Sequence, residues 1–129
     1  MEFLKAENIK RLQNWTCIVY SEPGKGKTSM VKSMAGRTLV FSTDGMYHVL
    51  SKLQDVDIVV MDPQKPNDDL GNFYRYLVKN LDKYDNVVID NLSTFQKFWL
   101  NAQAAMTKSG MPEMKDYGII DRVLLDFIA

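Results

Sequence analysis

The chain has 129 residues, of which 46% are hydrophobic and 25% are charged. This length and composition are typical of one globular domain over residues 1–129 and exclude a disordered or fibrous chain. Sixteen basic residues balance sixteen acidic ones, so a nucleic-acid surface could only be a local patch. One cysteine excludes an intramolecular disulfide. Because the sequence also lacks a long apolar run and a signal peptide, we expect a cytoplasmic protein.

The first half of the chain alternates apolar runs with segments of helical periodicity, which predicts an α/β fold with a mostly parallel sheet. A buried strand is expected over residues 15–20 (WTCIVY), with Cys17 as a small core residue. A loop follows, and then a helix over residues 28–35 that Gly36 ends. The next three elements are a strand, a short helix and a strand, over residues 38–42, 45–53 and 57–61.

The second half continues this alternation after a turn-rich stretch with two prolines (DPQKPNDD). Asn67 or Asp68 is expected to cap the next helix, which precedes a fourth strand over residues 86–90 (NVVID). Ser93 and Gln96 form the pattern of a capping box for the helix that follows this strand. The last two elements are a loop over residues 107–116 and a helix from about residue 117 to the end.

The loop SEPGKGKTS, residues 21–29, lies between the first predicted strand and its helix and is close to the phosphate-binding pattern GxxxxGK[ST]. Gly24 and Gly26 allow successive main-chain N–H groups to face a phosphate, and the N-terminal end of a helix adds positive potential. Lys27 is then expected to reach the β- and γ-phosphates, and the Thr28 hydroxyl to bind Mg²⁺. Ser21 replaces the first glycine, but that position leaves the strand and touches no phosphate in this interpretation.

The residues expected to bind the nucleotide are Glu22, Pro23, Gly24, Lys25, Gly26, Lys27, Thr28 and Ser29. For Lys25 a solvated side chain is the alternative. For the motif as a whole the alternative is a glycine turn between solvated lysines.

Two acids are candidates for the chemistry that a bound nucleotide needs. Asp90 ends the fourth strand and is expected to hold Mg²⁺, although a strand-ending aspartate can also simply form a turn. Asn91 follows it and cannot accept a proton, so the acid that activates water must come from elsewhere. Asp44, just past the second strand, is the available candidate, with an Asx-turn or a helix cap as its alternative.

EPGKGKT, Asp44 and NVVIDNLS, in that order, resemble the RecA-type ATPase core. The resemblance is closest to phage-encoded nucleotide-binding proteins related to RecA and RadA, some of which serve single-strand annealing in recombination. It covers roughly residues 15–100. It implies a P-loop NTPase with a RecA-like three-layer αβα fold, ATP and Mg²⁺ as cofactors, a homo-oligomer and the host cytoplasm. By this resemblance Lys27 and Asp44 are catalytic, and Thr28 and Asp90 bind the metal.

The sequence departs from the RecA-type pattern at two points. The catalytic acid is commonly glutamate, and the shorter Asp44 implies slow hydrolysis or binding with little turnover. The central strand that follows the metal-acid strand in RecA-type cores is also missing before Ala129. We therefore expect a C-terminally incomplete core from a longer protein. The alternative is a sheet in which the loop strand and the metal-acid strand are adjacent, as in small kinases.

The sequence is compatible with three functions. The first is an ATPase of phage DNA recombination or annealing, in which the loop TKSGMPEMK approaches single-stranded DNA with Lys108, Lys115, Met111 and Met114. For that loop a flexible surface segment is the alternative. The second function is a small kinase acting on a nucleoside or metabolite. The third is a nucleotide-binding module that does not hydrolyse its ligand.

Overall fold

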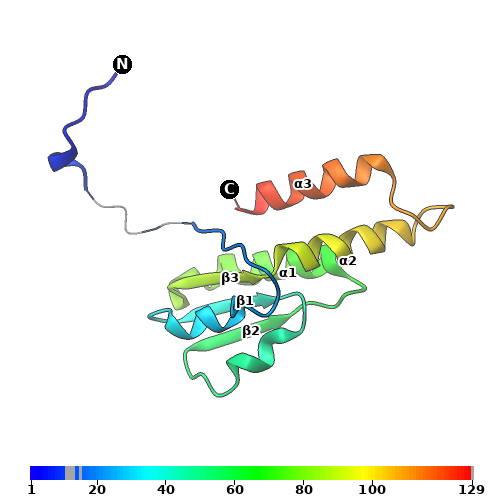
Figure 1. Ribbon diagram of the computed structural model, residues 1–129, viewed down its shortest axis with the longest axis horizontal. Helices are drawn as coiled ribbons and strands as arrows, with labels where there is room; N and C mark the ends of the chain where they lie inside the picture. The colour runs from blue at the N-terminus through cyan, green and yellow to red at the C-terminus, as the bar shows by residue number, and fades with distance from the viewer. Residues whose placement is uncertain (11–13, 15, 129) are drawn as a thin grey trace.

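The structure is a computed structural model that describes residues 1–10, 14 and 16–128. Its centre is a sheet of three parallel strands, β1 (Thr38–Ser42), β2 (Val56–Val60) and β3 (Asn86–Asp90), in the order β2-β1-β3 (Figure 1). β1 pairs residue by residue with both neighbours, so Ser42 lies level with Val60 and with Asp90. The carboxyl ends of all three strands therefore meet at one edge of the sheet.

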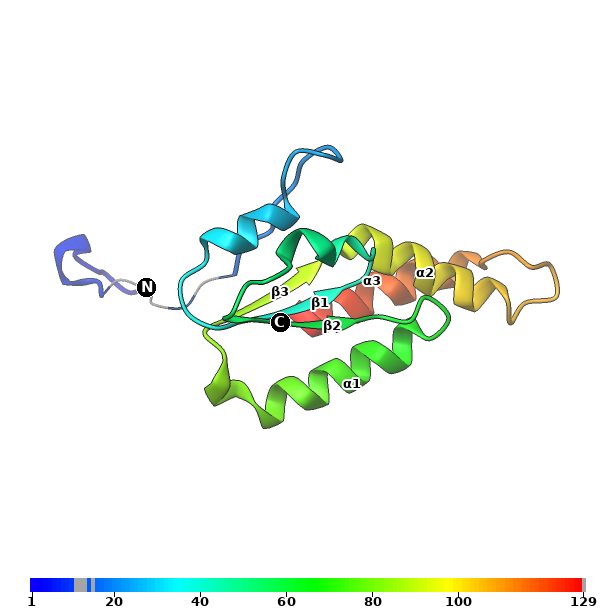
Figure 2. The same cartoon turned by 90° about the horizontal axis from the view of Figure 1, so that it is seen from below.

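Helices cover both faces of this sheet (Figure 2). One face carries α1 (Pro66–Lys79), α2 (Leu92–Ala104) and α3 (Met114–Ile128), whose apolar side chains share one core cluster with β1. The other face carries two short 3₁₀ helices, η2 (Thr28–Ser33) and η3 (Met46–Leu50). The remaining 3₁₀ turns are η1 (Ala6–Asn8) and η4 (Leu81–Lys83). No helix in the described ranges is long and apolar enough to cross a bilayer.

β1 is buried on both faces because alternate side chains of a strand point in opposite directions. Leu39 and Phe41 pack toward the α-helices, where the rings of Phe41 and Phe73 stack with their centroids 4.8 Å apart. Val40 packs toward the 3₁₀ helices, in contact with Val31. The run TLVFS is apolar almost throughout for this reason, as expected for a central strand of a parallel sheet. The predicted α/β fold with a parallel sheet is confirmed, and it is consistent with a P-loop NTPase fold.

The prediction of a strand over residues 15–20 is wrong for residues 16–20, which are the part of this range that the structure describes. Residues 16–20 have no strand pairing, and Ile18 and Tyr20 are 71% and 96% exposed. Cys17 is likewise exposed and is not a core residue, while Trp15 lies outside the described residues. An apolar run shows that a segment suits a sheet, but a strand also needs a neighbour that satisfies its main-chain groups. Within the described chain these five residues lack one.

The structure also corrects the predicted helix starts. The predicted helix over residues 28–35 is only the 3₁₀ helix η2. Neither Asn67 nor Asp68 caps α1, which begins with Pro66, whose fixed φ and missing N–H suit the first helical position. Asn91, and not Ser93, caps α2.

α3 begins earlier than predicted, at Met114. The buried Asp116 side chain explains this start, because its Oδ2 accepts a 2.8 Å hydrogen bond from the Glu113 N–H. An acid that reaches back over three residues in this way satisfies a main-chain donor at the helix start.

Candidate functional site

Polar residues gather at the carboxyl edge of the sheet, where β1 and β3 end side by side. Thr43 and Asp44 follow β1, and Asn91 follows β3. Clefts beyond the carboxyl ends of parallel strands are the usual ligand sites of open α/β sheets. The loop over residues 21–27 reaches the same edge, because the first residue of η2 bonds to the last residue of β3.

That contact joins Thr28 to Asp90. The Thr28 hydroxyl donates a 2.6 Å hydrogen bond to Oδ2 of Asp90, whose residue is only 8% exposed. Burial raises the pKa of the Asp90 carboxyl above its usual value, and the negative charge of Asp44 adds to the rise. The Thr28 hydrogen bond and the positive charge of Lys27 act in the opposite direction. Asp90 is thus a carboxylate for which a nearby cation would be favourable.

The loop backbone is curved at its two glycines. Gly24 and Gly26 have φ values of 77° and 87°, in the left-handed region that other residues rarely adopt. A Cβ placed on either glycine would meet nothing within 4 Å, so the space above them is open. Within the described chain, the main-chain N–H groups of residues 24 and 26–28 donate no hydrogen bond, while residues 23 and 24 form a turn. The loop therefore has main-chain donors without a described partner and open space beside its two glycines.

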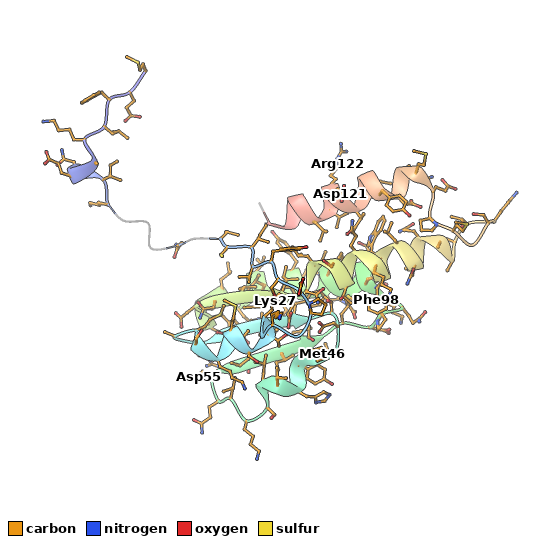
Figure 3. All side chains as sticks on the ribbon, viewed as in Figure 1. Lys27, Met46, Asp55, Phe98, Asp121 and Arg122 are labelled. Carbon is orange, nitrogen blue, oxygen red and sulfur yellow. The ribbon has the colours of Figure 1, made fainter. Side chains whose placement is uncertain are left out.

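Lys27 lies at the N-terminal side of η2, in front of the sheet in the view of Figure 3. Its ammonium group donates to the Ser21 carbonyl at 2.7 Å, to the Ser21 hydroxyl at 3.1 Å and to the Glu22 carbonyl at 3.2 Å. These contacts use all three ammonium donors within the lysine's own loop. Ser21, which was predicted only to touch no phosphate, is thus a partner of Lys27. A glycine at this position would keep the carbonyl acceptor and lose the hydroxyl.

Asp44 is held at both carboxylate oxygens. Its Oδ1 accepts a hydrogen bond from the Met46 N–H at 3.0 Å. This contact forms the Asx-turn that was the alternative role predicted for Asp44. Its Oδ2 accepts from Nδ2 of Asn91 at 2.9 Å. Gly45 is the N-cap residue of η3, so Asp44 is not its cap. The structure brings Asp44 into the same site as Asp90, to which it is linked through Asn91.

The other predicted loop residues make fewer contacts. Lys25 and Ser29 are exposed, and their side chains make no hydrogen bond to other described residues. Glu22 contributes its carbonyl to Lys27, and Pro23 is exposed. η2 has only six residues in 3₁₀ geometry, so it does not provide the α-helix N-terminus that was predicted next to the loop.

Three further polar residues lie at this edge and were not predicted as site residues: Ser42, Thr43 and Asn91. The buried Thr43 hydroxyl accepts from the Asn91 N–H and donates to the Asn91 carbonyl, both at 2.8 Å. The buried Ser42 hydroxyl has no partner among the described residues, and Ser42 is the register partner of Asp90. Only Asn91 carried a usable signal, because asparagine directly before a helical segment is a preferred N-cap.

Comparison with known proteins gives one family. Residues 13–128 match the family model described as an AAA domain, which is most of the chain. Neither a curated protein nor a solved structure matches the chain. The curved, amide-rich loop beside Lys27, Thr28 and a buried strand-end aspartate accords with that match. The chain therefore belongs to the AAA domain family and is a nucleotide-binding domain of the P-loop ATPase type.

Proposed function

We propose that the chain is a single nucleotide-binding domain that binds ATP through residues 21–29 and acts as a RecA-like ATPase in phage DNA recombination or single-strand annealing. The observation that supports this most directly is the set of N–H groups at residues 24 and 26–28 that have no partner among the described residues, with open space beside Gly24 and Gly26. Several donors directed at one space are what a chain of phosphates requires. The order of the loop, Asp44 and Asp90 along the chain is the basis for the RecA-like type.

Lys27 has the role of binding the terminal phosphates in this proposal. Its present partners are two carbonyl oxygens and one hydroxyl, which are neutral acceptors. A phosphate oxygen is charged, so it adds to the hydrogen bond a Coulomb attraction for the ammonium that a neutral carbonyl or hydroxyl acceptor does not offer. Lys27 can therefore exchange its loop partners for the β- and γ-phosphates when ATP enters.

The residues at the sheet edge fit a magnesium ion. The Thr28 hydroxyl and the Asp90 carboxylate already lie 2.6 Å apart, and both are hard oxygen donors of the kind that Mg²⁺ prefers. The Ser42 hydroxyl, which has no partner in the described part of the chain and lies level with Asp90 in the register, gives a further polar group on the same face. When bound, Mg²⁺ supplies positive charge against the terminal phosphates. Thr28 and Asp90 are the residues that would hold it.

No cluster of three or more His, Cys, Asp or Glu side chains suited to a metal occurs in the described part of the chain. This does not conflict with the proposal, because Mg²⁺ at nucleotide sites takes one or two protein ligands and completes its shell with phosphate and water.

Asp44 is proposed to receive a proton from the attacking water. A carboxylate has about four acceptor positions, and the contacts to Met46 and Asn91 use only two of them. The same two contacts also support the candidate function of a module that binds ATP without hydrolysing it, since they leave a short side chain little freedom to reach a water. Hydrolysis measured over hours separates these two functions.

Binding to single-stranded DNA belongs to the same proposal and is assigned to the loop between α2 and α3 together with the first turn of α3. Met111 in the loop and Met114 in that turn are 66% and 93% exposed, and exposure is needed for a side chain that wedges against bases. Lys115 pairs with Glu113 at 3.2 Å, so Lys108 carries most of the free positive charge of this segment. We therefore expect weak binding that falls as salt increases. Assembly into a homo-oligomer is part of this proposal as well.

Saturating Mg·ATP is expected to stabilise the protein against heat. At a free ligand concentration 100 times Kd, binding to the folded state adds about 2.7 kcal/mol to the free energy of unfolding, or roughly 10 °C in Tm for a domain of this size. Differential scanning fluorimetry with and without millimolar Mg·ATP measures this shift. An unmoved melting curve would remove the proposed function, and a shift without release of ADP would select the non-hydrolysing module.

Replacing Ser21 with alanine is expected to strengthen ATP binding. The change removes one acceptor that competes with phosphate for Lys27, while both carbonyl acceptors remain. The lost hydrogen bond has a charged donor, and such bonds contribute about 1.5–3 kcal/mol, so Kd should fall by no more than roughly 10- to 150-fold. Isothermal titration of the variant and the wild type with Mg·ATP measures the ratio. Weaker binding in the variant would mean that the hydroxyl supports the loop rather than competing with the ligand.

A further inference from the structure

Asn91 is fixed at both ends of its side-chain amide. Its Oδ1 accepts a 2.7 Å hydrogen bond from the Thr94 N–H, in the first turn of α2. Its Nδ2 donates the 2.9 Å hydrogen bond to Oδ2 of Asp44. The residue is half-buried at the point where β3 passes into α2. One side chain thus connects the start of a helix with the candidate catalytic acid.

The orientation of this amide is determined by its partners. An asparagine side chain has one accepting oxygen and one donating nitrogen. The Thr94 N–H can only donate and the Asp44 carboxylate can only accept. A rotated amide would set its nitrogen against the N–H and its oxygen against the carboxylate, and both contacts would become repulsive. The helix cap therefore forces the donor end of Asn91 toward Asp44.

The backbone of Asn91 is fixed as well. Both its N–H and its carbonyl bond to the hydroxyl of the buried Thr43, at 2.8 Å each. Thr43 directly precedes Asp44, and its own N–H bonds to the Asp90 carbonyl at 2.8 Å. The two strand ends that carry Asp44 and Asn91 are therefore held together by three hydrogen bonds independent of the Asn91 side chain. That rigidity lets the Asn91 amide define where the Asp44 carboxylate lies.

We infer that Asn91 is a positioning residue for ATP hydrolysis, which orients the Asp44 carboxylate toward the attacking water. The inference rests on the proposed function. In the step concerned, the water oxygen bonds to the γ-phosphorus, and the bond from that phosphorus to the β,γ-bridging oxygen breaks with its electron pair on ADP. One water proton passes to Asp44. Asn91 exchanges no proton and acts only through its hydrogen bond to Asp44.

Two substitutions separate this role from helix capping. Asn91→Asp keeps an N-cap acceptor for Thr94, because aspartate caps helices as well as asparagine does. It removes the donor to Asp44 and sets a second carboxylate against it. Asn91→Ala removes both functions. Asn101→Asp, at an exposed position on the same helix, adds the same charge away from the site and is the matched control.

The expected result is a split between turnover and binding. A misplaced reacting group can cost on the order of 100-fold in rate, so we expect kcat to fall roughly 10- to 100-fold in both Asn91 variants. The Kd for Mg·ATP should stay within about 3-fold of wild type, since Asn91 is not among the residues proposed to touch the nucleotide. Only Asn91→Ala should lose thermal stability through its cap, by roughly 3–6 °C in Tm. The Asn101→Asp protein should match wild type in kcat and in Kd, and its Tm should fall slightly because a negative charge in the last turn of α2 opposes the helix dipole.

The outcomes are distinct. If the wild type hydrolyses ATP and Asn91→Asp does so equally fast, the residue only caps α2, and the inference is overturned while the proposed function stands. A fall in Mg·ATP affinity that accounts for the whole loss of rate would also overturn it. A wild-type protein without ATP hydrolysis overturns the proposed ATPase itself, and the role of Asn91 with it. A reduced kcat with unchanged Kd in Asn91→Asp supports the inference.

Discussion

Replacement of Lys27 by alanine is expected to weaken Mg·ATP binding by roughly 10- to 150-fold, because a hydrogen bond to a charged group contributes about 1.5–3 kcal/mol. The fold should be nearly unaffected. Among the described residues the ammonium donates its hydrogen bonds to Ser21 and Glu22, within its own loop, and to no residue of the hydrophobic core. The ratio of the two Kd values, from titration calorimetry, and the Tm of each free protein measure these effects.

Lys32→Ala is the matched control for this prediction. Lys32 lies in η2, whose N-cap residue is Lys27, and is exposed, and its side chain makes no hydrogen bond or ion pair to other described residues. The Lys32→Ala substitution removes the same charge five positions further along the chain. Equal losses of ATP affinity in both variants would show that the affinity depends on the net positive charge of this region and not on a specific contact of Lys27. An unchanged Kd in Lys27→Ala would refute the phosphate-binding role of this loop.

Replacement of Asp90 by asparagine is expected to act in opposite directions on stability and on binding. The asparagine Oδ1 can still accept from the Thr28 hydroxyl, so the 2.6 Å contact has a substitute. The charge that would face Mg²⁺ is lost, which should weaken magnesium-dependent ATP binding by about 10- to 150-fold. The free protein should become more stable at neutral pH, because a buried carboxylate next to Asp44 is removed.

The pH dependence gives this prediction a definite sign. Asp90 has an unfolded-state pKa near the ordinary value of 3.8, and burial raises the pKa in the folded state. Between these two values the folded protein binds more protons than the unfolded one, so its stability falls as the pH rises. The stability advantage of Asp90→Asn should therefore be small at pH 4 and larger at pH 7. Chemical denaturation of both proteins at the two pH values measures the difference.

Asp82→Asn serves as the control, since Asp82 is exposed and its side chain has no hydrogen bond within the described residues. It should show no comparable change between the two pH values. A lower stability of Asp90→Asn at pH 7 would mean that the ionised carboxylate stabilises the free protein, contrary to the burial and to the neighbouring charge. Unchanged magnesium dependence would remove Asp90 from the proposed metal site.

Segments with a strong local pattern were predicted well. The strands over residues 38–42 and 86–90 have the predicted limits, because continuous apolar runs suit strands that are covered on both faces. The third strand is displaced by one residue. The position of Asp90 at a strand end followed from the same pattern. Helix starts were predicted less well, since several nearby polar residues could each cap them and only the packed chain selects one.

The sequence by itself determined the order of the elements, the parallel sheet and the loop with its two glycines, because these depend on the periodicity and conformational range of neighbouring residues. Only the tertiary structure decided that residues 16–20 have no strand partner among the described residues, that Ser21 bonds to Lys27, and that Asn91 holds Asp44. Asp44 and Asn91 are 47 positions apart in the chain and meet because β1 and β3 are paired in register. Such contacts are set by strand pairing between distant segments, which no local pattern specifies.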